Sequence, residues 1–148
     1  MITLAMYWMG RDETHAHELT DEIRANAERT LAIINPLLEM FFQANPSAAH
    51  RFVQSGWRPA SINAAAGGAA RSCHLTGEAV DLSDRDRELA RWLVQRPDVL
   101  ESAGLWMERP ESTASWAHLQ TRPVGARYFW PSRSGYEQWV AAGGKAFA

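Results

Sequence analysis

The chain of 148 residues is 46% hydrophobic, which suits one compact domain with a single core, since domains commonly have ~100–150 residues. Its 15 Lys and Arg side chains against 17 Asp and Glu side chains leave a net charge of −2, so there is no large positive field to attract a nucleic acid. Cys73 is the only cysteine, which excludes an internal disulfide and a four-cysteine zinc ribbon. We therefore expect a monomer of one domain, residues 1–148, with no nucleic-acid partner.

The first residues, MITLAMYWMGRDE, have the features of neither a signal peptide nor a membrane span. They lack a basic segment and a small-residue cleavage site, and their apolar run is far shorter than the ~20 residues that cross a bilayer. We interpret them as part of the folded protein and expect no membrane partner. The protein would then be cytoplasmic as made, and would act elsewhere only after release by another route.

A long helix is predicted from Leu19 to about Asn45, because apolar residues recur there at three- and four-residue steps. Thr20 can cap its first turn. Pro36 falls inside the pattern and lacks an amide donor, which predicts a kink or two abutting helices.

The middle of the chain predicts short strands and one further helix. The run HRFVQSGWRP is prone to form a strand, and ASINAAAGGAAR reads as a loop after it. GEAVDL is a second strand candidate. A helix should follow, capped by Ser83 or Asp84 and ending near Pro97.

The last third predicts a hairpin and a tail. GLWME and SWAHLQ flank RPESTA, a spacing that suits two paired strands. The tail, about residues 131–148, is rich in aromatic residues and glycine, and we expect it to pack over the core before it frays. Helices first and short strands later indicate an α+β fold, with N-terminal helices packed on a small antiparallel sheet.

The stretch SCHLTGEAVD contains a candidate for two-thirds of a metal site. His74 and Asp81 stand seven residues apart around Gly77, which permits a tight turn, so two adjoining segments could present both side chains to one point. A catalytic zinc site needs three protein ligands, and His118 in WAHLQ is the best remaining candidate. Spacing alone leaves open the alternative of a plain polar turn.

The same stretch resembles the Ser-x-His-x-x-Gly-x-Ala-x-Asp motif of the M15-type zinc peptidases, and every fixed position is met. This family includes D-alanyl-D-alanine carboxypeptidases and dipeptidases and L-alanyl-D-glutamate endopeptidases, and it shares a fold with the hedgehog signalling domain. SGWRP is similar to the family's Gly-aromatic-Arg segment, and SWAHLQ to its aromatic-x-His strand. The three motifs occur in the family's order over residues 55–120.

The resemblance implies one zinc ion per chain, held by His74, Asp81 and His118. It also implies an α+β fold of the hedgehog and D-Ala-D-Ala peptidase type.

The resemblance further implies contacts with the substrate. Arg58 would face a carbonyl or carboxylate of the substrate, since a guanidinium offers a fixed fork of donors. Ser72, Ser115 and Gln120 are candidates for further substrate contacts. Without the motif, a surface ion pair would be the simpler interpretation of Arg58.

The general base departs from the family pattern. Family members commonly have a glutamate or aspartate three residues before the last histidine, where this chain has Ser115. A neutral serine cannot take a proton from water as a carboxylate does, so Glu108 and Glu111 are the candidates to replace it. In a hairpin, Glu108 would lie roughly opposite Ser115 or Trp116, which makes it the first choice.

The leading hypothesis is a zinc metallopeptidase that cuts stem peptides of bacterial peptidoglycan, as a carboxypeptidase or an endopeptidase. Similar compact domains serve as cell-wall lysis enzymes, or endolysins, of phages and prophages. A second hypothesis keeps the zinc but not the chemistry and assigns a role as a wall-binding or structural module. A third, a metal-free interaction domain, requires the motif to be accidental.

Overall fold

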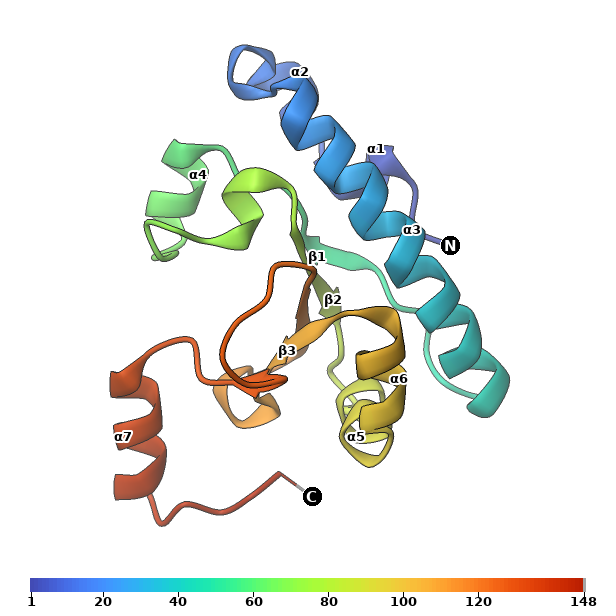
Figure 1. The fold of residues 1–148 in the computed structure, drawn as a ribbon, viewed down its shortest axis with the longest axis vertical. Coiled ribbons are helices and arrows are strands. Elements are labelled where there is room, and N and C mark those ends of the chain that lie inside the picture. The colour runs from blue at the N-terminus through green and yellow to red at the C-terminus, as the bar shows by residue number, and fades with distance from the viewer. Residues whose placement is uncertain (148) are drawn as a thin grey trace.

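The computed structural model describes residues 1–147, which form a five-stranded sheet flanked by helices (Figure 1). The sheet has the order β1-β2-β4-β3-β5. Its strands are β1 Val53–Ser55, β2 Ala79–Ser83, β3 Trp106–Glu108, β4 Trp116–Gln120 and β5 Tyr128–Phe129. The pairs among β1 to β4 are antiparallel, as predicted, but β5 is parallel to β3, so the sheet is mixed. The α+β class is confirmed.

Helix α3, Asp21–Ala44, runs along one side of the sheet and contacts α1, the η2 turn and α6 (Figure 1). Thr20 caps it as predicted, because its hydroxyl accepts a hydrogen bond from the Ile23 amide at 3.2 Å. The helix continues through Pro36, so the alternative of two abutting helices is wrong. Ala32 and Pro36 both lie on the exposed face, where water can satisfy the carbonyl that proline leaves without a donor.

The N-terminal segment is part of the fold, as predicted. It forms α1 Leu4–Trp8, α2 Arg11–Thr14 and the 3-10 turn η1 Ala16–Glu18. The fully buried Tyr7 donates its hydroxyl to the Ala79 carbonyl at 2.8 Å, and Trp8 packs edge-on against the buried Trp57. The start of the chain is thus fastened to the first residue of β2.

The region after β1 is more helical than predicted. The expected loop contains helix α4 Ala60–Ala65, and the motif itself forms the 3-10 turn η2 Cys73–Thr76. The single helix expected after β2 is two helices, α5 Glu88–Gln95 and α6 Pro97–Ala103. Pro97 ends the first and begins the second, since proline suits the first turn of a helix.

Asp84 caps α5 from a distance. Its carboxylate accepts hydrogen bonds from the Leu89 and Ala90 amides, each at 3.0 Å, although α5 begins only at Glu88. Of the two predicted cap residues, Asp84 is therefore the right one. The predicted start of the helix is too early, because Arg87, which adopts a left-handed conformation, lies between Asp84 and the first helical residue.

The C-terminal part adds the 3-10 turn η3 Pro110–Ser112 and helix α7 Arg133–Ala141. Helix α7 has no buried residue and stands off the body of the molecule (Figure 1). The prediction that the tail packs over the core is therefore wrong. Phe147, beyond α7, returns to stack on the Arg87 guanidinium. No helix within residues 1–147 is both long enough and apolar enough to cross a membrane.

The turn between η2 and β2 is pressed against α3. Gly77 adopts φ +77°, and its carbonyl accepts a hydrogen bond from the buried Thr30 hydroxyl at 3.0 Å. Asn26 donates to the Thr76 carbonyl at 2.9 Å. A Cβ atom on Gly77 would lie 2.7 Å from the Ile23 carbonyl oxygen, so only glycine fits both the conformation and the space.

Replacing Gly77 with alanine should therefore lower the free energy of unfolding by about 2–3 kcal/mol, through the left-handed conformation and the clash with α3 together. Gly104→Ala is the matched control, because Gly104 also has a positive φ but no atom would lie within 4 Å of its added Cβ. It should cost only about 1 kcal/mol. Urea denaturation in the presence of a chelator measures the free energy of unfolding of both variants. Equal losses of stability in Gly77→Ala and Gly104→Ala would contradict the close contact between Gly77 and α3.

Candidate metal centre

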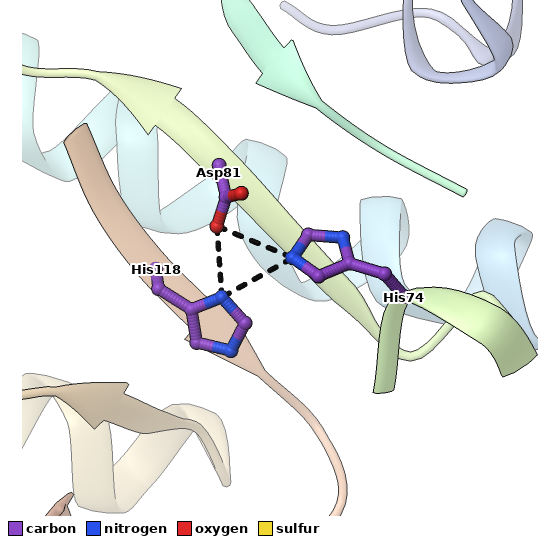
Figure 2. A group of neighbouring side chains, drawn as sticks. All are labelled: His74, Asp81 and His118. Atoms are coloured by element: carbon purple, nitrogen blue, oxygen red, sulfur yellow. Dashed lines mark hydrogen bonds and ion pairs between the residues drawn. The ribbon is translucent and has the colours of Figure 1, made fainter. Parts of the chain in front are cut away.

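Three ligand-type side chains converge from three elements (Figure 2). Asp81 is the middle residue of β2, and His118 is its direct partner on the neighbouring strand β4. His74 comes from the η2 turn, which Gly77 reverses toward the start of β2. Pairing and turn thus direct the three predicted ligands to one point.

The ligand atoms form a compact triangle. Asp81 Oδ1 lies 2.8 Å from His118 Nδ1 and 3.3 Å from His74 Nε2, and the two nitrogens are 3.3 Å apart. Tetrahedral ligands ~2.0–2.1 Å from a zinc ion are separated by about 3.3 Å. Two edges of the triangle therefore already match a zinc site, and only the edge between Asp81 Oδ1 and His118 Nδ1 would have to lengthen.

The far side of each imidazole fixes which nitrogen carries the proton. His74 Nδ1 lies 2.7 Å from the Gly56 carbonyl oxygen, which can only accept, so Nδ1 must donate. His118 Nε2 lies 3.2 Å from Gln120 Oε1. The Gln120 amide is oriented by its own Nε2, which donates to the Arg122 carbonyl at 2.6 Å.

With those protons assigned, neutral imidazoles turn two nitrogen lone pairs toward the Asp81 carboxylate. Three electron-rich atoms at this separation repel one another unless a cation lies between them. In metal-binding histidines, a hydrogen bond from the far ring nitrogen likewise turns the lone pair of the other nitrogen toward the metal. The donor set of two imidazoles and one carboxylate suits zinc.

The electrostatics of the cluster keep Asp81 ionised. Burial acts to raise the pKa of Asp81, but the adjacent His118 and His74 outweigh it and hold the pKa well below its usual range. Burial lowers the pKa of His74 and favours its neutral form. Burial also acts to lower the pKa of His118, but Asp81 and Glu108 raise it overall.

A cavity of about 670 Å³ opens onto this triangle, and Asp81 and His118 line it. His74 is fully buried behind them. Four of the other predicted site residues also line the cavity: Arg58, Ser72, Glu108 and Gln120. Glu111 and Ser115 are not among the lining residues.

The hairpin register brings Glu108 close to the candidate metal ligands. Strand β3 pairs antiparallel with β4, and Met107 lies opposite Leu119. The next pair in this register is Glu108 with His118, so the predicted position opposite Ser115 or Trp116 is wrong. The reason is the connection, where the η3 turn keeps residues 109–115 out of the ladder and lengthens the loop.

Glu108 has a perturbed pKa. Burial raises it, and the Asp81 charge raises it further, while His118 and Arg58 offset part of the increase. A carboxylate with a raised pKa is a better proton acceptor than an ordinary carboxylate.

Glu111 and Ser115 make contacts elsewhere. Glu111 Oε1 accepts a hydrogen bond from the Phe147 amide at 3.0 Å, so this carboxylate fastens the end of the chain. The Ser115 carbonyl accepts from the Asp84 amide at 2.7 Å, at the far end of β4.

Arg58 and Ser72 flank the turn that carries His74. The Arg58 amide donates to the His74 carbonyl at 3.0 Å, and the Ser72 hydroxyl accepts from the His74 amide at 3.3 Å. The buried Arg58 Nε atom has no hydrogen-bond partner within residues 1–147. Arg58 also lines the cavity.

Several lining residues were not predicted. Cys73 is buried, as expected, but it belongs to the η2 turn rather than an extended segment, and it lines the cavity. Arg122, Phe129 and Trp130 also line it. These three follow the last motif, in a segment without recognisable periodicity, so no sequence signal identified them.

A family model described as Peptidase M15 matches residues 20–105, more than half of the chain. The match includes His74 and Asp81 and ends before Glu108 and His118. Among curated proteins, no match to the chain was found.

The contact between Gln120 and His118 predicts a measurable effect on metal binding. Gln120→Leu removes the acceptor that orients the His118 ring, so zinc affinity should fall about 10- to 100-fold. Competition with a chromophoric chelator measures it. Gln138→Leu on the exposed α7 is the control and should bind zinc like the unaltered protein. Unchanged affinity in Gln120→Leu would contradict the assigned role of the amide.

Proposed function

Because the chain belongs to the M15 peptidase family, we propose that it is a zinc-dependent peptidase that hydrolyses peptide bonds in the stem peptides of bacterial peptidoglycan. The observation that carries the proposal is the triangle of His74, Asp81 and His118 at a cavity that Glu108 and Arg58 also line. Binding groups, an acid–base group and a cation therefore meet in one site.

The proposal includes one zinc ion per chain. A zinc ion held by these three ligands would polarise the substrate carbonyl as a Lewis acid and lower the pKa of a water molecule. The residues that hold it are His74, Asp81 and His118, with Gly56 and Gln120 orienting the two rings.

Glu108 is the proposed general base. It lines the cavity next to His118 in the strand register, and its raised pKa suits a group that takes a proton from water and returns it to the leaving amine. Ser115 occupies the usual position of the base in sequence but cannot perform this step. Glu108 would therefore supply from β3 the carboxylate that β4 lacks.

Arg58 is proposed to bind the oxygen on which negative charge develops, or a carboxylate of the substrate. Arg58 lines the same cavity as Asp81 and Glu108, and its buried Nε has no hydrogen-bond partner within residues 1–147. A fixed donor in a partly buried site stabilises a developing oxyanion more than water does. Ser72 and Gln120 would act mainly by holding His74 and His118.

The alternative is a zinc-binding wall module without catalysis, and the serine at position 115 is the observation that favours it. A buried carboxylate in the cavity favours the enzyme instead. Incubation with peptidoglycan and with the pentapeptide L-Ala-γ-D-Glu-L-Lys-D-Ala-D-Ala, with and without chelator, decides between them. Mass spectrometry should detect chelator-sensitive fragments, and their masses identify an exopeptidase or an endopeptidase. Zinc binding without any fragment would support the module.

Zinc binding itself is tested with His74→Ala. Elemental analysis of the unaltered protein should find about one zinc per chain, and His74→Ala should lose it. Zinc that binds only the folded state at about 1,000 times its Kd contributes about 4 kcal/mol, so chelation should lower the melting temperature of the unaltered protein but not that of His74→Ala. His17→Ala, whose side chain is 78% exposed, should behave like the unaltered protein. Undiminished zinc in His74→Ala would remove this ligand assignment.

The general base is tested with Glu108→Gln. This change preserves size and hydrogen bonding but removes the proton acceptor, so kcat should fall about 100-fold or more at unchanged zinc content. Glu111→Gln is the matched control and should retain activity. If Glu111→Gln abolishes turnover and Glu108→Gln does not, the two roles are exchanged.

A further inference from the structure

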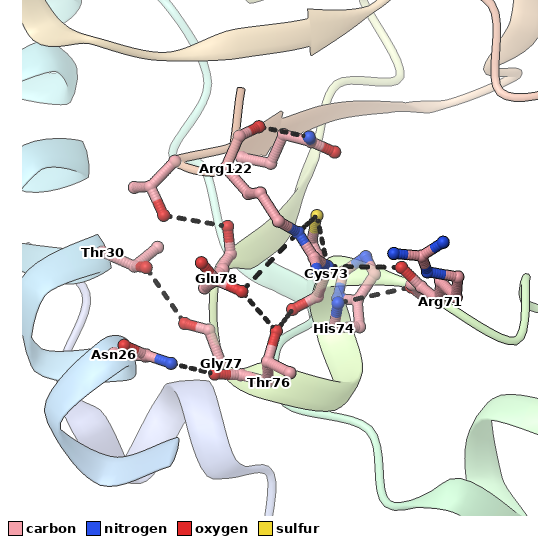
Figure 3. A network of polar contacts seen from close by, with 12 residues as sticks. Asn26, Thr30, Arg71, Cys73, His74, Thr76, Gly77, Glu78 and Arg122 are labelled. Carbon is pink, nitrogen blue, oxygen red and sulfur yellow. Dashed lines mark hydrogen bonds and ion pairs between the residues drawn. The ribbon is translucent and has the colours of Figure 1, made fainter. Parts of the chain in front are cut away.

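Arg122 lies on the cavity wall, and the chemistry proposed above does not use it. Its guanidinium reaches back to the η2 turn, where Nε and Nη2 donate to Cys73 Sγ at 3.1 and 2.9 Å (Figure 3). Nη2 also donates to the Arg71 carbonyl at 3.2 Å. These contacts hold one edge of the guanidinium against the residue that precedes His74.

The backbone of Arg122 is coupled to the metal ligands as well. The Gln120 amide that accepts from His118 donates to the Arg122 carbonyl at 2.6 Å. Arg122 is thus fixed at its main chain by the His118 strand and at its head by the His74 turn. Its position relative to the ligand triangle is set by both.

The guanidinium retains unused donors. Within residues 1–147 its Nη1 makes no hydrogen bond, and two of its three hydrogen bonds go to a thiol sulfur, which is a weak acceptor. The nearest carboxylate oxygen, Glu78 Oε2, is 3.7 Å from Nε and already accepts from the Thr76 hydroxyl at 2.6 Å. Glu78 therefore compensates the charge of Arg122 only in part.

The cavity as a whole carries an excess of cations. Arg58, Arg71 and Arg122 line it, against the carboxylates of Asp81 and Glu108. A zinc ion would add further positive charge. A partly enclosed cavity of this charge favours an anionic ligand.

We propose that Arg122 binds a free carboxylate of the peptide substrate and makes the enzyme selective for acidic over amidated peptides. The inference rests on the peptidase function proposed above. A stem peptide offers two such groups, the α-carboxylate of its D-glutamate and its C-terminal carboxylate. A hydrogen bond to a charged group corresponds to about a 10- to 100-fold preference.

The first experiment needs no variant. The zinc-loaded protein is given L-Ala-γ-D-Glu-L-Lys-D-Ala-D-Ala as the free acid, with only the D-glutamate carboxylate amidated, or with only the C-terminus amidated. One amide should have kcat/KM about 10- to 100-fold lower than the acid, and it identifies which carboxylate is bound. Equal values for all three peptides overturn the proposal while leaving the peptidase function intact.

The second experiment assigns the preference to Arg122. Arg122→Gln should lose the preference for the acid, with KM raised for the acid and unchanged for the amide. Arg122→Lys should keep part of this preference because the charge remains. Arg133→Gln is the control for loss of charge, since its side chain is 91% exposed on α7. A full preference in Arg122→Gln overturns the assignment. If this variant does not fold, Arg122→Lys decides, and a preference equal to that of the unaltered protein counts against Arg122.

Failure of the peptidase function is a separate outcome. If the zinc-loaded protein cleaves none of the three peptides, calorimetry measures their binding instead. Tighter binding of the acid by about tenfold or more, lost in Arg122→Gln, supports the carboxylate site in a non-catalytic protein. Equal binding of acid and amides overturns it.

Discussion

The direct pairing of Asp81 with His118 across β2 and β4 is the constraint on which the site depends. Side chains alternate between the faces of a sheet, so a slip of one residue in this pairing would turn one ligand away from the other. The neighbours of both ligands hold the register. Val80, Leu82 and Leu119 are completely buried in the core, and Tyr7 fastens the first residue of β2 through its hydroxyl. The same packing that stabilises the sheet therefore aligns two of the ligands.

The third ligand depends on a different set of contacts. His74 is carried by a short 3-10 turn, which has little stability of its own. Thr30 and Asn26 of α3 hold this turn from one side, and the buried Trp57 donates to the Leu75 carbonyl at 3.1 Å. The long N-terminal helix thus contributes to the site without supplying a ligand. The buried Thr30 and the half-buried Asn26, rather than the apolar stripe of the helix, make these contacts.

Sequence motifs predicted the site better than they predicted the elements around it. His74 and Asp81 were identifiable because the stretch around Gly77 resembles a family motif at every fixed position, and His118 because SWAHLQ resembles the family's aromatic-x-His strand. The long helix and the β3–β4 hairpin were predictable for a similar reason, since their patterns are local. The position of Glu108 was not, because it depends on how many residues the η3 turn removes from the ladder. The position of Arg122 on the cavity wall was missed because it depends on contacts with residues 49 and 51 positions away.

The separation of the ligands along the chain has a mechanical consequence. His118 lies 37 residues after Asp81, and helices α5 and α6, strand β3 and the η3 turn lie between them in the chain. A metal ion bound to both would close this stretch of the chain as a reversible cross-link, and closing a long loop removes conformational entropy from the unfolded chain. With Cys73 as its only cysteine, the chain has no covalent way to do the same. Supply of the ion would then determine how firmly α5 and α6 stay attached to the sheet.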